Sequence, residues 1–208
     1  MSRAPRPSQQ TGSQQRWRVA VEAARLISEH GLRDYRMAKE KAAAQLGLTD
    51  SRSLPNNSEV EQALREHQRL FGGEGHGRHL DELRKQAHQA MTFLAAFEPR
   101  LVGAVLDGTA DQHSAICLQL YTDQPQAVMV LLDEHGITHE ESSRRLRLDH
   151  VTSREFPVLR FIAGDTGIDL TVLPYDLLRQ APLDRVTEKP MQRATLAMLD
   201  GLIGRTSD

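Results

Sequence analysis

The chain has 208 residues, an apolar fraction of 39%, a charged fraction of 26% and a formal net charge of −2. These values are typical of a soluble globular protein and give no general attraction to nucleic acid or to an acidic membrane. There is no run of 18 apolar residues and no signal-peptide region, and one cysteine excludes an internal disulfide. We therefore expect a cytoplasmic protein without a membrane segment.

The N-terminal part of the chain begins with a polar segment. Residues 1–14 are rich in Pro, Ser and Gln, a composition that predicts a disordered tail. A helix is expected from Gln15, ending near Gly31. Residues 22–32, EAARLISEHGL, resemble the first helix of TetR-type regulators, which implies DNA binding. The segment that follows is longer than the turn and recognition helix of that motif, so a plain helical bundle is the favoured alternative.

Three further helices are expected before the first strand. Asp34 is placed to cap a helix that runs to Leu46, and Ser58 followed three residues later by Glu61 has the spacing of a capping box. Residues 72–77, GGEGHG, predict a flexible joint without the Gly-Lys-Ser/Thr ending of a phosphate loop. A long helix is then expected over residues 79–97. We assign residues 15–98 to a helical domain.

The first two expected strands surround a polar turn. Residues 101–106 are almost continuously apolar, as in a strand covered on both faces. Residues 114–121 alternate, because Ile116, Leu118 and Leu120 point to one face and the residues between them point to the other. The turn Asp107-Gly108-Thr109 lies between the two strands.

The rest of the chain alternates between helices and strands. A helix capped by Asp123 is expected over residues 124–135, and a tight turn at residues 164–167 leads into a strand. The other predicted elements are strands over residues 146–151 and 158–162 and a helix over residues 191–203. This order predicts an α+β fold in which residues 99–208 form one domain. Arginines 145, 147 and 160 suit either a triphosphate or nucleic-acid backbone or a plain solvated face.

Three segments of this domain resemble the nucleotidyltransferase fold, the catalytic core shared with DNA polymerase β and the small bacterial nucleotidyltransferases. Gly108-Thr109 is similar to the Gly-Ser turn that follows the first strand of that fold. Residues 114–118, SAICL, are similar to the second strand, which carries an Asp-X-Asp pair. Residues 167–172, GIDLTV, resemble the strand that bears the third carboxylate. The spacer after Gly108-Thr109 is shorter than usual for the family.

The resemblance implies a set of site residues. Asp169 would be the catalytic residue or metal ligand, and Gly108, Thr109 and Ser114 would bind the nucleotide. Mg²⁺ would be the cofactor of an active enzyme, because two hard cations stabilise the entering and leaving oxygens of nucleotidyl transfer. Ala115 and Cys117 stand at the two positions of the aspartate pair.

Three functions remain open on the sequence alone. The favoured one is a nucleotidyltransferase-like module whose metal site is lost and which binds a nucleotide, an RNA or a protein partner. The second is an active metal-dependent nucleotidyltransferase, in which Asp107, Asp111 or Asp123 replaces the missing ligands. The third is DNA binding by the N-terminal helices. In the first case Cys117 is expected to be a partly buried thiol on the sheet.

Overall fold

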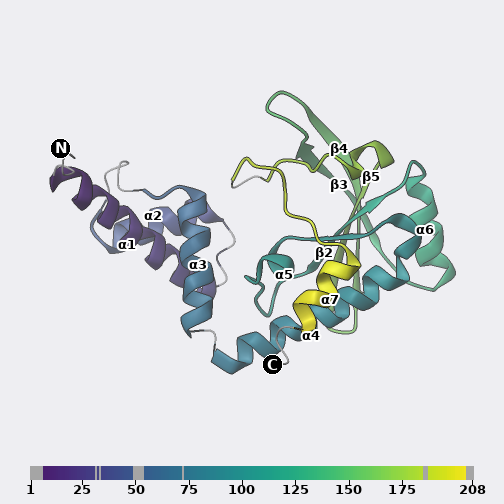
Figure 1. Cartoon of the computed structure of the whole chain (residues 1–208), viewed down its shortest axis with the longest axis horizontal. Helices are drawn as coiled ribbons and strands as arrows, with labels where there is room; N and C mark the ends of the chain where they lie inside the picture. The colour runs from purple at the N-terminus through teal and green to yellow at the C-terminus, as the bar shows by residue number, and fades with distance from the viewer. Residues whose placement is uncertain are drawn as a thin grey trace. The chain divides into compact units, whose positions relative to one another are not determined.

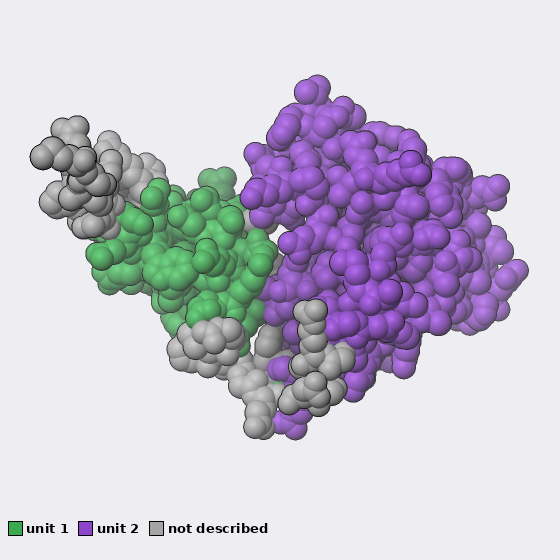
Figure 2. Space-filling view, in the orientation of Figure 1, with its two compact units in different colours: residues 1–76 green, residues 77–208 purple. Residues whose placement is uncertain are grey.

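The chain divides into two compact units, residues 1–76 and residues 77–208 (Figures 1 and 2). The computed structural model describes residues 7–30, 32, 34–48, 54–71, 73–184 and 187–204. The division falls inside helix α4 (Gly73–Phe93), upstream of the boundary at residue 98 that the sequence suggested. The reason is that α4 buries Leu83, Ala87 and Met91 in the same core as the strands.

Unit 1 consists of helices with a core built mainly from small side chains. Its described helices are α1 (Pro7–His30), α2 (Tyr35–Gln45) and α3 (Asn57–Phe71). Alanine predominates in the core, which contains Val19, Ala20, Ala23, Ala24, Leu26, Ala38, Ala42, Ala43, Val60, Ala63 and Leu64. Helix α1 begins at Pro7, within the segment whose composition predicted a disordered tail. Proline suits the first position of a helix, because its missing N–H has no helical partner there.

The N-caps of α2 and α3 show which of the predicted capping residues form hydrogen bonds to the helix start. The side chain of Asp34 accepts hydrogen bonds from two backbone N–H groups at the start of α2, as predicted. The capping box of α3 is formed by Asn56 and Glu59 instead of Ser58 and Glu61. The Glu59 N–H donates to Asn56 Oδ1 at 2.8 Å, and the Asn56 N–H donates to Glu59 Oε2 at 2.7 Å. Both pairs have the same spacing, so the pattern alone left the start of the helix uncertain by two residues.

Unit 2 is built around one five-stranded mixed sheet with the strand order β1-β2-β5-β4-β3. Its strands are β1 (Arg100–Val102), β2 (Ile116–Tyr121), β3 (Glu140–Arg147), β4 (Ser153–Ala163) and β5 (Thr166–Leu173). Besides α4, its helices are α5 (Ala104–Asp107), α6 (Pro125–Glu134) and α7 (Leu196–Gly204), with short 3₁₀ turns η2 (Ala95–Phe97) and η3 (Tyr175–Leu178). The fold class is α+β, as the sequence predicted. No described helix is long and apolar enough to cross a membrane.

The three strands that the sequence placed together are neighbours. Strand β2 pairs with β1 in antiparallel fashion and with β5 in parallel fashion, so that Cys117 lies beside Asp169 and Leu118 beside Leu170. The first strand is shorter than the predicted range 101–106, because the chain turns at Gly103 and enters α5. Leu101 and Ala194 exchange two backbone hydrogen bonds of 2.9 Å, so the outer edge of β1 is also paired.

Several boundaries differ from their predicted positions. Helix α4 begins at Gly73, within the expected joint, and α7 begins only at Leu196. Strand β3 begins at Glu140 and ends at Arg147, so residues 148–151 of the predicted range 146–151 are not in a strand, whereas β4 extends beyond the range 158–162 at both ends. Asp123 does not cap α6. Its carboxylate accepts a hydrogen bond from the N–H of Tyr175, and the N-cap position belongs to Gln124.

The two faces of the sheet have different surroundings. Helices α4 and α6 cover one face (Figure 1), where alternate strand residues such as Ile116, Leu118 and Leu170 are buried. The opposite face carries Asp169 and Thr171, and we call it the polar face. A second cluster of buried side chains lies on this face, at the end opposite Asp169. It packs the sheet against η3. It consists of Tyr121, Leu146, Leu148, Phe156, Leu173 and Leu177.

Candidate functional site

Asp169 is the centre of a three-residue ion-pair cluster on the polar face. Arg160 lies opposite it on β4, and its Nε donates to Asp169 Oδ2 at 3.0 Å. Arg144 reaches it from β3, with one terminal nitrogen 3.0 Å from Oδ1 and the other 2.8 Å from Oδ2. The same guanidinium also donates to the hydroxyl of Thr171 at 2.9 Å. Strand alternation places all four side chains on one face.

The three ion-paired residues carry an excess of positive charge, and Glu140 is the register neighbour of Arg160 on β3. Two guanidinium groups and one carboxylate leave one net positive charge. The Asp169 side chain is only 10% exposed, whereas those of Arg144 and Arg160 are 29% and 51% exposed. Arg160 uses only Nε in the cluster, and its two terminal nitrogens have no hydrogen-bond partner within the described part of the chain. The cluster therefore presents N–H donors to an incoming anion while the aspartate stays covered.

Ala115 and Cys117, which the resemblance aligns with an aspartate pair, lie next to this cluster. Cys117 is the register neighbour of Asp169, and Ala115 contacts the next strand, since a Cβ placed on Gly167 would lie 3.5 Å from the Ala115 Cβ. The Cys117 thiol is half-buried and lies 3.7 Å from the Ala115 carbonyl oxygen, to which it donates. The expectation of a partly buried thiol on this face is confirmed.

These residues do not fit a magnesium site. Mg²⁺ needs oxygen ligands in an octahedral arrangement, and Ala115 and Cys117 supply no carboxylate. Both oxygens of Asp169 are held by arginine. Nowhere in the described ranges do three His, Cys, Asp or Glu side chains come together as a metal site.

The predicted nucleotide-binding residues lie in the connection between α5 and β2. Gly108 adopts a left-handed conformation at the end of α5, and a Cβ placed there would lie 3.8 Å from Leu80 and 3.9 Å from Arg84. This glycine therefore packs against α4. Thr109 follows it, and its N–H bonds back to the carbonyl of α5's first residue, so the pair closes the helix.

Ser114, the third predicted nucleotide-binding residue, is engaged in a local turn. Its hydroxyl donates to Asp111 Oδ1 at 2.8 Å and accepts a hydrogen bond from the Asp111 N–H at 2.9 Å. The His113 N–H donates to the same carboxylate oxygen of Asp111. These bonds hold the chain just before β2. They do not direct the Ser114 hydroxyl to the Asp169 cluster.

Gly103 is the turn residue that the sequence reasoning missed. It follows β1 directly, with φ of +73°, and a Cβ there would lie 3.9 Å from the Cβ of Cys117. The backbone at Gly103 thus approaches the positions of the aspartate pair, whereas Gly108 does not. The signal was present in the sequence, because a glycine ends the apolar pair Leu101-Val102, but the strand was extended past it.

Arg144 was missed as well, although its neighbour Arg145 was noted. It lies in a charged segment without hydrophobic periodicity, and its partner Asp169 is distant in sequence. Only the strand order β5-β4-β3 brings the two residues together. No local pattern could have indicated this ion pair.

Away from the Asp169 cluster, the side chains of the polar face form a chain of hydrogen bonds that involves Tyr121, Gln119 and Arg193. The Tyr121 hydroxyl donates to Gln119 Oε1 at 2.8 Å and accepts from Arg193 at 2.6 Å. The same arginine nitrogen donates to the Leu177 carbonyl, and the amide of Gln119 contacts the sulfur of Met191. Burial raises the pKa of Tyr121, and the hydrogen bond from Arg193 opposes that rise.

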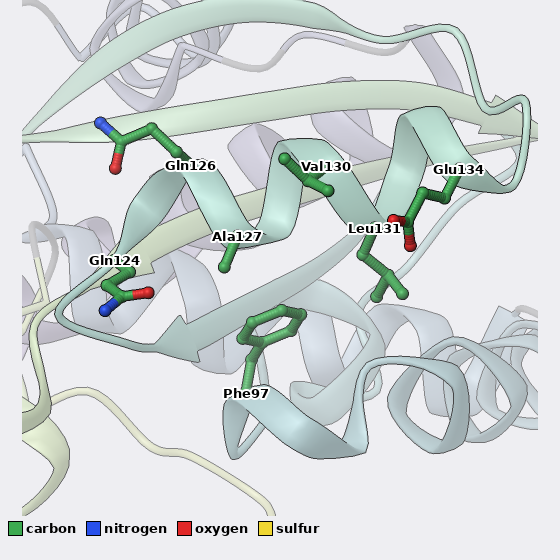
Figure 3. Close-up of a pocket in the computed structure, with 7 residues that line it drawn as sticks. All are labelled: Phe97, Gln124, Gln126, Ala127, Val130, Leu131 and Glu134. Carbon is green, nitrogen blue, oxygen red and sulfur yellow. The ribbon is translucent and has the colours of Figure 1, made fainter.

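A pocket of about 540 Å³ lies elsewhere, between η2 and α6 (Figure 3). Phe97 points toward α6 from below, and Ala127 and Leu131 point toward Phe97. Helix α6 covers the apolar face of the sheet, so this pocket is separate from the Asp169 cluster. None of its lining residues belongs to the predicted site, and we do not base the function on it.

Comparison of the chain with models of protein families, with curated proteins and with solved structures found no match.

Proposed function

We propose that unit 2 is a nucleotidyltransferase-like domain that binds the phosphates of a nucleotide through Arg144 and Arg160, without a two-metal catalytic centre. The observation that carries this proposal is that two arginines hold Asp169, the residue at the position of the family's third carboxylate. In place of a carboxylate cluster that attracts cations, the polar face has a cluster that attracts anions.

The arginine geometry suits a phosphate. A guanidinium group is planar and can donate two parallel hydrogen bonds to phosphate oxygens. The bond between Arg160 Nε and Asp169 fixes the plane of the guanidinium group while its two terminal nitrogens remain exposed to a ligand. Asp169 then acts as a positioning residue, because it orients both arginines and reduces their mutual repulsion.

The alternative of an active enzyme has weaker support. Asp111 is engaged by Ser114, and Asp123 accepts a hydrogen bond from the Tyr175 N–H. Asp107 lies in α5, on the chain segment that leads to the Gly108 turn. None of the three forms a metal-binding group with other carboxylates among the described residues. A metal-dependent reaction at this face would require Asp169 to leave both arginines.

DNA binding by unit 1 also has weaker support than a plain helical bundle. Arg25 forms ion pairs with Glu22 and Glu29, at 2.7 and 2.6 Å, and Arg36 pairs with Glu40 at 2.9 Å. Side chains paired in this way are partly neutralised toward DNA phosphates. We therefore place the ligand-binding function in unit 2.

The proposal is tested by titrating the whole protein with a nucleoside triphosphate in calorimetry, once with EDTA and once with Mg²⁺. We expect binding in EDTA, and about tenfold weaker binding for Arg160→Gln, which corresponds to about 1.4 kcal/mol. Arg179→Gln is the matched control, because Arg179 is an exposed arginine of the same unit outside the cluster. Binding that requires Mg²⁺, or equal losses in the two variants, would refute the proposal.

A further inference from the structure

Strand β3 is an edge strand of the sheet, and its outer side is largely exposed. Among the described strands it is last in the order β1-β2-β5-β4-β3 and pairs with β4, and Leu183 bridges to it at Arg147. Residues 140–143 of this strand are all exposed. A strand in this position has a row of backbone N–H and C=O groups that can pair with another chain.

The structure shows which residues of β3 direct their backbone groups outward. The Leu183 N–H donates to the Arg147 carbonyl at 2.7 Å from the side away from β4, so the backbone of Arg147 points outward. Backbone direction alternates along a strand, and Arg145, Ser143 and Glu141 therefore also point outward. Pro157, which lies opposite Ser143 on β4, fits this assignment, because a pair without mutual hydrogen bonds needs no N–H from proline.

The charges of β3 have a block order. Its sequence is EESSRRLR, so the acidic residues precede the two serines and the basic residues follow them. An alternating charge pattern would fit many partners weakly. A block of acid followed by a block of base is complementary to its own reverse, which is the order presented by a second copy in antiparallel pairing.

We propose that β3 pairs with β3 of a second copy of this chain, antiparallel and centred on Ser143. In this register the outward-facing residues Glu141 and Arg145 lie opposite each other, once on each side of the two-fold axis. Each directly opposite, outward-facing pair can exchange two backbone hydrogen bonds. The sheets of the two copies become continuous, and the interface is isologous.

Other registers are less favourable. A shift that centres the pairing on Arg144 places two arginines opposite each other, and like charges in that position repel. At the far end of the strand Leu183 already occupies the edge beside Arg147. The pairing therefore extends over about residues 141–145, which predicts a weak dimer that depends on protein concentration and dissociates at high salt.

The test is sedimentation velocity of the whole protein over a range of concentrations and salt. We expect dimer formation in the native protein and monomer for Ser143→Pro, which removes an outward N–H but no bond to β4. Glu141→Arg and Arg145→Glu should each weaken the dimer by about tenfold, since each replaces two attractive pairs by two repulsive ones.

The charge exchange supplies the decisive control. The double variant Glu141→Arg/Arg145→Glu, made together with Glu155→Arg because Arg145 lies opposite Glu155 on β4, restores opposite charges in every pair and should dimerise as the native protein does. Glu134→Arg makes the same change of charge on α6, away from the edge, and should leave the dimer intact. A native protein that stays monomeric, a dimer that survives Ser143→Pro, or a double variant that is no better than the single ones would overturn the proposal. None of these outcomes depends on whether the Asp169 cluster binds a nucleotide.

Discussion

The two faces of the unit 2 sheet are held by different forces. On the face under α4 and α6, side chains such as Leu118 and Leu170 are fully buried, and burial of apolar surface fixes which way each strand faces. On the polar face the arrangement depends on one carboxylate that binds arginines from two other strands. The part of the first face that the helices cover is specified by burial of apolar side chains, whereas the polar face is specified by the geometry of a few polar groups and leaves donors exposed.

The largest effect is expected from truncating one apolar side chain on each face. Leu170→Ala should lower the free energy of unfolding of unit 2 by about 2–5 kcal/mol, because it leaves a cavity in the core. Ile162→Ala, at a position that is 76% exposed, should change it by less than about 0.5 kcal/mol. The only tryptophan, Trp17, lies in unit 1, so amide hydrogen exchange of the strands is the suitable measurement. Comparable losses at the two positions would show that both faces are buried.

The next test concerns Asp169. Asp169→Asn should lower the stability of unit 2 by about 2 kcal/mol, because the hydrogen bonds to charged groups are weakened and two arginines are left to repel each other. Arg160→Gln should cost less than about 1 kcal/mol, since its side chain is half exposed. Denaturant unfolding followed by hydrogen exchange measures both changes. If Arg160→Gln were the more damaging, the role of Asp169 as the centre of the cluster would be wrong.

A designed metal site tests whether the arginines hold Asp169 on the polar face. The variant Ala115→Asp/Cys117→Asp places three carboxylates near one another, but the arginines compete with a metal ion for Asp169. We expect little stabilisation by Mg²⁺ or Mn²⁺ until Arg144→Gln and Arg160→Gln are added. The free energy of unfolding of the quadruple variant should then rise by about 1.4 kcal/mol when the metal is present at ten times its Kd.

Thermal melts with and without metal measure this response. A strong response of the unmodified protein would show that Asp169 can leave its arginines, and it would favour the enzyme alternative. The absence of any response in the quadruple variant would place the three carboxylates too far apart to share an ion.

The smallest effect is expected at Tyr121. Its pKa in the folded protein is raised above the ordinary value of 10.0, mainly by burial. Above pH 10 the unfolded chain loses the proton first, so this contribution to stability is complete below pH 10 and falls as the pH rises toward the folded pKa. Tyr121→Phe should cost about 1 kcal/mol at neutral pH, through its lost hydrogen bonds. The cost should shrink in alkaline solution, which unfolding curves from pH 8 to 11 would reveal. A constant cost would contradict the raised pKa.

The features of this fold that could be predicted are those indicated by the local pattern of apolar residues and glycines. The alternation of Ile116, Leu118 and Leu120 indicated the face of β2, and Gly136 marked the end of α6. These features depend on residues close together in sequence and on burial alone.

The remaining features depend on contacts between distant residues. Strand β3 has no hydrophobic period, since a charged edge strand has no face that must be buried until Leu146. The binding of Asp169 by Arg144 requires the strand order, which the sequence did not predict. The turn at Gly103 was missed because the predicted first strand extended through residue 106. Of the predicted site residues, the structure has Asp169 on the polar face, Gly108 against α4 and Thr109 at the end of α5.

The pairing of Leu101 with Ala194 has a consequence for how the chain acquires its fold during synthesis. The edge of β1 lacks its partner until residue 194 has been made, and the central β2–β5 pair must wait for residue 173. At an elongation rate of about 5–20 residues per second, the apolar strands made first stay incomplete for several seconds. A chain that stalls before residue 194 would keep this edge open, and it would be a target for chaperones or for aggregation.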